Sequence, residues 1–316
     1  MSPFLFVANE LGSDRSFSPG RLLSLTLSSS LSSPAQSLSA RLFVEQYPRE
    51  LTRAAIYYKD AFLFIGKVDE QHLEICAEGN ILQVEARSQG GLLLDNEAAP
   101  YTYAGVSLRD MFNIFVAPYG FTLQQPANAV RQAEFTVPKG VSEWEAFCRF
   151  ALRACGQLPY LRENRVLLEK PDFTPVHLIE NSGEGLRFCK LEHLNDRCEA
   201  ISQIYLRDDN GVYQCVVSME NLDNVKIARR RYMIPADEFG SDAQMDAVQR
   251  AWRSLWQKER LRVLLPGMLQ AQPGQGARVK HGGLSFEGYY IEQVTHILNA
   301  NGLFTQLLLH KAAYRR

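Results

Sequence analysis

The sequence lacks the features that mark several large classes of protein. It contains only 6 cysteines in 316 residues, and no two of them form a C-x-x-C pair. Cysteines this sparse exclude a disulfide-stapled scaffold and favour synthesis in a reducing, cytoplasmic compartment. No stretch approaches the roughly 20 apolar residues that a membrane-spanning helix needs. The N-terminal segment MSPFLFVANE has no basic region before its apolar residues, so it does not have the pattern of a signal peptide.

An excess of charge of one sign is also missing. The 34 Lys and Arg residues nearly balance the 35 Asp and Glu residues, which leaves a net charge of -1. The basic runs, Arg229 to Arg231 and Arg315 to Arg316, are short enough to be ordinary solvated surface. A protein that binds nucleic acid or an anionic membrane usually carries a basic patch or stripe. We therefore expect no nucleic-acid partner and no membrane partner.

Motifs of catalysis and cofactor binding are absent as well. The chain has no H-E-x-x-H, no G-x-S-x-G and no glycine-rich loop that ends in G-K-[ST], and its 6 histidines are scattered. No neighbouring motifs supply a nucleophile, a base and a group that orients the base. We therefore expect no enzyme activity, no catalytic residues and no cofactor.

Cys148 and Cys155 are the first cysteines that need an explanation. They lie seven residues apart in a predicted helix, which is about 10.5 Å along its axis. That separation exceeds the reach of a disulfide bond. Both share the apolar face of Trp144, Phe147 and Ala151, away from the helix N-terminus that would stabilise a thiolate. The spacing predicts that both cysteines are packing residues.

A second cluster places Cys189, His193 and Cys198 within ten residues. Zinc accepts such ligands, and His177 or Cys215 could supply a fourth. The spacing matches no common zinc module, and no second ligand pair accompanies it. We expect small apolar cysteines, a surface histidine and no metal.

Two regions of the chain have the pattern of β-strands. Alternating segments rich in β-branched and aromatic residues predict strands at 21–29, 40–46, 54–60, 61–69 and 81–87. Such closely spaced strands indicate a small antiparallel barrel or sandwich. The Ser- and Pro-rich stretch 28–39 is expected to be a mobile loop. Strands resume at 200–208, 212–218, 262–269, 289–299 and 303–312, with a hairpin turn at Asn299 to Gly302.

Three helices are predicted from their ends. Ser107 is a candidate N-cap for the first helix, and Ser142 with Glu145 forms an S-x-x-E capping box for the second, which ends at Gly156. Ser241 begins a third helix that continues to about residue 260. The first two helices lie between the two β regions, and the third lies inside the second region.

The order of these parts resembles the baseplate hub proteins of contractile-tailed phages, the family of the Mu tail hub and the late-control D proteins. The resemblance extends from about residue 20 to 312. The matching positions of the central part are Leu92 to Asp95, Gly105, Ser107, Met111, Pro138, Gly140, Ser142, Trp144 and Glu145. The matching positions of the last strand pair are Val294, His296, Gly302, Thr305, Leu307 and Leu309.

The resemblance implies an α+β, mostly β fold with two small antiparallel β-barrel-like domains that flank a compact α/β module. The corresponding domains are residues 1–98, 99–178 and 179–316, with a helical insertion at about 241–260. The implied protein is a structural baseplate hub of a phage or prophage. It forms a trimeric ring that joins the six-fold tail tube to the three-fold central spike.

The partners implied by the resemblance are two further copies of the chain, a tail tube protein and a central spike protein. The implied location is the virion tail baseplate, after synthesis in the bacterial host cytoplasm. Two other functions remain open at this stage, a tail-associated hydrolase and a stand-alone ligand-binding β protein.

Two tryptophans of the third helix are relevant to a ring. A closed ring needs a patch on each subunit that meets a different patch on the next, and aromatic residues often anchor such contacts. Trp252 lies on the apolar stripe of the helix, and Trp256 lies one turn further on. We predict that Trp252 packs inside the subunit and that Trp256 lies nearer a subunit interface.

Overall fold

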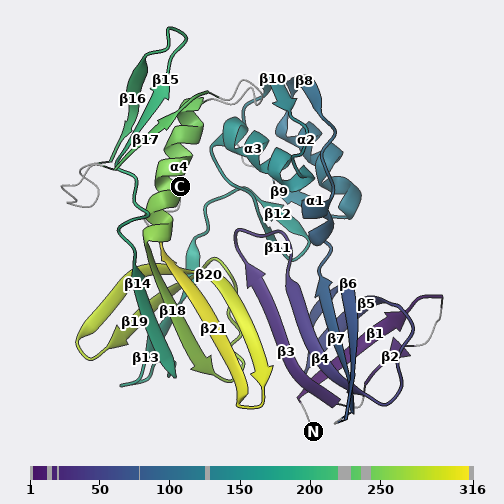
Figure 1. Cartoon of the computed structure of the whole chain (residues 1–316). Coiled ribbons are helices and arrows are strands. Elements are labelled where there is room, and N and C mark those ends of the chain that lie inside the picture. Colours follow the sequence, from purple (N-terminus) through teal and green to yellow (C-terminus); the bar gives the residue numbers. More distant parts are fainter. Residues whose placement is uncertain are drawn as a thin grey trace.

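The computed structural model describes residues 3–12, 16–19, 21–77, 79–124, 129–219, 229–235 and 243–312. The described chain is mostly β, as predicted, with helices gathered above two groups of strands (Figure 1). No described helix combines the length and the apolar character needed to cross a membrane.

A first β unit precedes the helices. Its strands are β1 (Phe4–Glu10), β2 (Ser16–Phe17), β3 (Arg21–Ser30), β4 (Ser37–Val44), β5 (Leu51–Tyr58), β6 (Ala61–Cys76) and β7 (Gly79–Arg87). Alternation explains how they pack: Leu82, Val84 and Ala86 of β7 are buried on one face while their neighbours are not. Successive side chains of a strand point to opposite faces, so the buried set forms one core.

The central module contains the first two of the three predicted helices. Its elements are α1 (Gly91–Asp95), β8 (Tyr101–Val106), α2 (Leu108–Phe115), η1 (Ala117–Tyr119), β9 (Thr122–Gln124), β10 (Gln132–Val137), α3 (Glu143–Cys155), β11 (Tyr160–Arg162) and β12 (Arg165–Leu167). The Ser107 side chain caps α2, and the Ser142 side chain accepts a hydrogen bond from the Glu145 amide at the start of α3. Gly156 ends α3 in the left-handed conformation, as predicted.

A second β unit follows the module. Its strands are β13 (Phe173–Glu180), β14 (Lys190–Asn195), β18 (Glu259–Pro266), β19 (Gln275–His281), β20 (Leu284–Asn299) and β21 (Gly302–Lys311). An insertion between β14 and β18 contains β15 (Gln203–Arg207), β16 (Tyr213–Ser218), β17 (Arg230–Met233) and α4 (Ala243–Lys258). The predicted cap Ser241 lies outside the described residues.

The two β units share a single sheet rather than forming two separate barrels. The described strands close no barrel, and the 13-stranded sheet follows the order β14-β18-β21-β20-β3-β4-β7-β6-β5-β1-β2. Off this path, β19 pairs with β20 and β13 pairs with β19. The reason is the length of β20, which has 16 residues. Its first half pairs with β19, and its second half extends past β19 and pairs with β3.

The two units nevertheless repeat one strand order. In the first unit the order is β1-β5-β6-β7-β4-β3, and in the second it is β13-β19-β20-β21-β18-β14. The outermost pair differs in direction, because β1 is antiparallel to β5 whereas β13 is parallel to β19. The remaining neighbours within each unit are antiparallel in both units.

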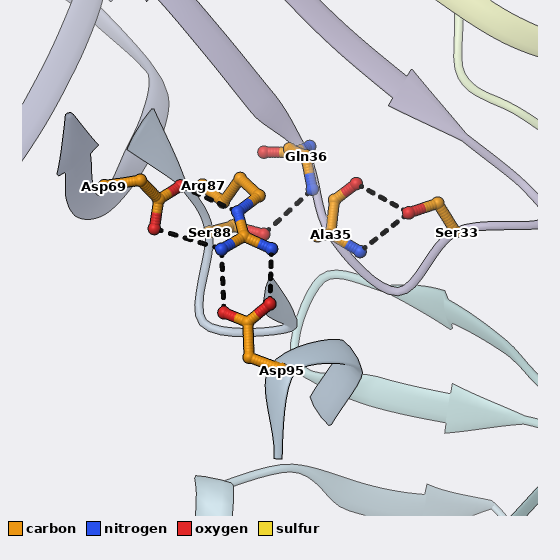
Figure 2. A network of polar contacts seen from close by, with 7 residues as sticks. All are labelled: Ser33, Ala35, Gln36, Asp69, Arg87, Ser88 and Asp95. Atoms are coloured by element: carbon orange, nitrogen blue, oxygen red, sulfur yellow. Dashed lines mark hydrogen bonds and ion pairs between the residues drawn. The ribbon is translucent and has the colours of Figure 1, made fainter. Parts of the chain in front are cut away.

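The expectation of a mobile loop at 28–39 is wrong. Residues up to Ser30 belong to β3, and residues from Ser37 belong to β4. Hydrogen bonds fix the connection between them, because the Ala35 amide donates to the Ser33 hydroxyl and the Gln36 amide donates to the Ser88 hydroxyl (Figure 2). The serine content of this segment led to a prediction of mobility, but serine hydroxyls here accept hydrogen bonds from backbone amides and hold the segment in place.

Candidate functional site

The two cysteines of α3 lie in surroundings that disfavour the reactive thiolate form. Cys148 and Cys155 are both half-buried and contact the core of the module. Burial raises the pKa of both thiols, so both stay protonated near neutral pH. The Cys155 thiol donates to the Ala151 carbonyl at 3.1 Å, which occupies its one hydrogen. Their prediction as packing residues is confirmed.

The second cysteine cluster is spread over separate contacts. The His193 ring lies 5.1 Å from the ring of Phe286. The Cys198 sulfur accepts a hydrogen bond from Arg229, and Cys189 is exposed. His177 contacts Gln275, and the Cys215 thiol donates to the Val217 carbonyl. Within the described ranges, no group of three His, Cys, Asp or Glu side chains is arranged to hold a metal ion.

These environments predict an order of thiol reactivity. At about pH 8, alkylation of the folded protein should modify the exposed Cys189, Cys198 and Cys215 first and Cys148 last, because the thiolate is the reacting species. Peptide mass spectrometry of a time course measures this order, with the urea-unfolded protein as the control. Rapid labelling of Cys148 or Cys155 alone would instead indicate a catalytic thiol.

The junction between the two β units contains a network of polar groups around a buried carboxylate. Glu292 of β20 is only 2% exposed. Its carboxylate accepts hydrogen bonds from the Ser30 hydroxyl at 3.1 Å, the Ser32 amide at 3.0 Å and the Tyr290 hydroxyl at 3.2 Å. The Glu292 carbonyl also accepts from the Leu31 amide at 2.8 Å. One residue of the second unit therefore holds the end of β3 in the first unit.

The helical insertion is anchored on the same network. The Trp256 indole N–H donates to the Tyr290 hydroxyl at 2.7 Å. The Trp256 ring also stacks on His310, with ring centres 4.1 Å apart and planes 17° apart. A ring nitrogen of His310 is 2.8 Å from the Trp256 carbonyl oxygen. A continuous chain of contacts thus joins α4, β21, β20 and β3.

Both tryptophans of α4 contact their own subunit. Trp252 is 9% exposed and packs with Leu255 and Ala200, so its predicted internal position is confirmed. Trp256 is half-buried on Tyr290 and His310. A cavity of about 400 Å³ lies where α3, α4 and the β3–β4 connection meet, and its lining includes Leu31, Ser32, Trp144, Cys148, Trp252 and Trp256. A role of Trp256 in a subunit interface stays a prediction.

A second junction ties the first β unit to the module (Figure 2). The Arg87 guanidinium at the end of β7 donates to both carboxylate oxygens of Asp69 at 2.7 and 3.1 Å. It also donates to both oxygens of Asp95 in α1 at 2.9 and 2.7 Å. Hydrogen bonding to Arg87 lowers the pKa of Asp95. Because a guanidinium is planar, two bidentate pairs fix the angle between β7 and α1.

A buried carboxylate also connects strands within the second β unit. Glu259 of β18 accepts hydrogen bonds from Tyr289 and from the Lys311 ammonium, the latter at 2.6 Å, and lies 3.4 Å from His193. Burial alone would raise the pKa of Glu259. The hydrogen bonds from Lys311 and Tyr289 outweigh burial, so the pKa of this carboxyl is lower than usual.

The lowered pKa gives a pH-dependent prediction. The charged form of Glu259 stabilises the fold above the unfolded carboxyl pKa of about 4.3, and this contribution is lost as pH falls through the lower folded pKa. Glu259→Gln should reduce the free energy of unfolding by about 1–3 kcal/mol at pH 7. The difference should shrink toward pH 3 in urea titrations. Glu192→Gln, which changes an exposed ion pair, should have little effect, and an equal deficit at both pH values would contradict the prediction.

The fold has neighbours among solved structures. A tail protein from Neisseria meningitidis MC58 superposes with a TM-score of 0.77 and 13% identity, over 99% of this chain and 98% of that chain. The 43 kDa tail protein of prophage MuSo2 from Shewanella oneidensis gives 0.76 and 13%, over 98% and 99%. The E. coli c3393 protein, a component of the type VI secretion system with similarity to T4 tail proteins gp27 and gp5, gives 0.60 and 9%, over 95% and 75%.

The likeness at this level of identity is a likeness of fold. No protein-family model matches the sequence, and no curated protein matches it. The chain therefore has the fold of phage tail proteins over nearly its whole length, with little of their sequence.

Proposed function

We propose that the protein is the structural hub of a contractile phage-tail baseplate. Three copies form a ring, one face of the ring binds the six-fold tail tube, and the other face binds the three-fold central spike. The partners are therefore two further copies of the chain, the tube protein and the spike protein. The chain acts by assembly rather than by catalysis, and it is located in the virion tail after synthesis in the host cytoplasm.

The observation that carries this proposal is the repeated strand order of the two β units within one chain. A six-fold tube offers six equivalent positions, whereas a three-fold spike offers three. A subunit with two similar units satisfies both symmetries, because three copies supply six similar units. The fold shared with phage and prophage tail proteins over 98–99% of the chain supports the same assignment.

Hydrogen bonds and ion pairs also hold the parts of the chain at fixed angles to one another. Glu292 connects the two β units, and Arg87 connects the first unit to the module. A hub transmits load between a tube and a spike, so fixed angles between its parts serve that role. Cys155, His177 and Cys215 each make a hydrogen bond within the fold, which agrees with a structural role.

The direct test is the size and symmetry of the protein in solution. Light scattering should give three times the 35.8 kDa mass of one chain, alone or with the tube or spike protein. Class averages from electron microscopy should show a three-fold ring with six similar lobes. A chain that stays monomeric at high concentration, with both partners present, would overturn the proposal.

A further inference from the structure

The two β units correspond residue by residue over their long hairpins. β6 and β20 both contain 16 residues, and a shift of 223 positions aligns them. Each begins after a two-residue turn with positive φ, at residues 59–60 and 282–283. The partner strand of each hairpin, β7 or β21, begins at a glycine with nearly the same unusual φ, 125° at Gly79 and 122° at Gly302.

The irregularities of the two hairpins correspond as well. The β6–β7 register shifts between Val68 and Glu70, and the β20–β21 register shifts between Ile291 and Gln293. Bulges are specific features of a strand, so two bulges at matched positions indicate one underlying structure. The buried Glu292 and the exposed Asp69 are the residues at these two bulges.

The strands that lie beside the hairpins in the sheet correspond too. In the first unit β7 pairs with β4 and β4 with β3, which places Leu25 of β3 opposite Ala40. In the second unit β21 pairs with β18 and β18 with β14, which places Leu191 of β14 opposite Val263. β14 is therefore the counterpart of β3, and Leu191 is the counterpart of Leu25.

The chain pairs β20 with β3, whereas the corresponding strands β6 and β14 do not pair with each other. The second half of β20 pairs with β3, from Gln293 opposite Ser30 to Leu298 opposite Leu25. The corresponding half of β6, residues 70–75, pairs with β7 on one edge and with no described strand on the other. β14 pairs with β18 on one edge and likewise has no described strand on its other edge.

We infer that β14 of one copy pairs in antiparallel fashion with the second half of β6 of the next copy. This inference rests on the proposed ring and identifies its subunit contact. In Figure 1 the left-hand group of strands contains β14 and the right-hand group contains β6. The contact joins different patches of two subunits, and such a contact builds a ring when its rotation closes, here after three copies. Each interchain junction then repeats the intrachain one.

We apply the register of the β20–β3 pair to β6 of one copy and β14 of the next, which gives the residues that face each other across the contact. Ile75 lies opposite Leu191, His72 opposite Leu194, and Gln71 opposite Asn195. Ile75 is 75% exposed and Leu194 is 44% exposed in the single chain. Exposed strand edges with apolar side chains are sites of pairing with another chain, and native proteins normally cover or protect them.

The charges at the contact also agree with this register. Glu74 lies opposite Glu192, and both carboxylates have basic neighbours. Arg41 is 3.8 Å from Glu74, while Lys190 and Arg262 are 2.7 and 3.2 Å from Glu192. Three cations beside two carboxylates offset the repulsion between them.

A disulfide across the contact tests the inference. The intrachain counterpart of the pair His72 and Leu194 is Thr295 and Ser28, whose side-chain oxygens lie 3.0 Å apart. His72→Cys with Leu194→Cys should therefore place two sulfurs within bonding reach across subunits. Both positions are exposed, so the substitutions should not prevent folding. Serine replaces the native cysteines that are not in the module, namely Cys76, Cys189, Cys198 and Cys215.

Oxidation of this variant, at a concentration where light scattering shows the ring, should convert most of the protein to covalent trimers on a non-reducing gel. The pair Ser28→Cys with Thr295→Cys is the positive control and should crosslink within one chain. The pair Glu70→Cys with Leu194→Cys, two residues out of register, should crosslink little. Leu194→Asp should reduce the measured mass from three chains to one, whereas Val212→Asp at another exposed site should not.

The outcomes separate this inference from the proposed function. A ring that gives no covalent trimer and that tolerates Leu194→Asp would overturn the β14–β6 contact while leaving the hub intact. A wild-type chain that forms no ring with its partners would overturn both.

Discussion

Glu292→Ala is expected to lower the free energy of unfolding by about 2–4 kcal/mol, because buried donors would lose their acceptor. The carboxylate is 2% exposed and accepts from the Ser30 hydroxyl, the Ser32 amide and the Tyr290 hydroxyl. Alanine removes all three hydrogen bonds and leaves a space that surrounding side chains fill only in part. Urea unfolding at pH 7 measures the loss.

Two matched variants sharpen this expectation. Glu292→Gln keeps one acceptor oxygen and should cost less than alanine. Glu287→Ala changes an exposed carboxylate on the same strand, whose contact to Arg278 is 3.6 Å, and should change stability by less than about 0.5 kcal/mol. Hydrogen exchange should also quicken at the Leu31 amide, which donates to the Glu292 carbonyl. Equal stabilities for Glu292→Ala and Glu287→Ala would contradict the role of this network.

The parts of the fold that the sequence predicts are those encoded locally. Ser107 and Ser142 mark the starts of α2 and α3, and Gly156 marks the end of α3, because caps act within one turn of the helix. The β20–β21 hairpin follows from its Asn- and Gly-containing turn, which ends at Gly302. Each of these signals depends only on residues that are close in the chain.

The junction of the two β units is not encoded in that way. Ser28 and Thr295 are 267 positions apart, and the strands that hold them pair through backbone groups that every residue possesses. Hydrophobic alternation fixes which face of a strand is buried but not which strand lies beside it. For this reason the sequence predicts two separate barrels where the structure has one continuous sheet.

The buried polar residues were missed for a related reason. Glu292 stands beside Gln293 in the strand, and two adjacent polar residues have the pattern of solvent-facing positions. Only the fold shows that the Ser-rich end of β3 supplies its donors. Its burial among hydroxyl and amide donors would become predictable from sequence only if the pairing of β20 with β3 were known first.

The junction between the first β unit and the module depends on a glycine that makes a close backbone contact. A Cβ at Gly90 would lie 1.9 Å from the Pro34 carbonyl oxygen and 2.6 Å from its carbon. The backbone at Gly90 has φ -62° and ψ -16°, which alanine adopts without strain. Any destabilisation by Gly90→Ala is therefore steric, and the connection that contains Pro34 is held by hydrogen bonds and cannot move freely.

Gly90→Ala should accordingly reduce the free energy of unfolding by about 3 kcal/mol, at the upper end of the range for overpacked sites. Urea unfolding measures the loss, and Gln89→Ala at the exposed neighbouring position is the control, with an expected change below about 0.5 kcal/mol. Shifting the β3–β4 connection to relieve the clash would disturb the bond between Gln36 and Ser88, so amide exchange at Gln36 should quicken in Gly90→Ala alone. Wild-type stability in Gly90→Ala would show that this connection yields at little cost, and the first β unit would then not be held rigidly on the module.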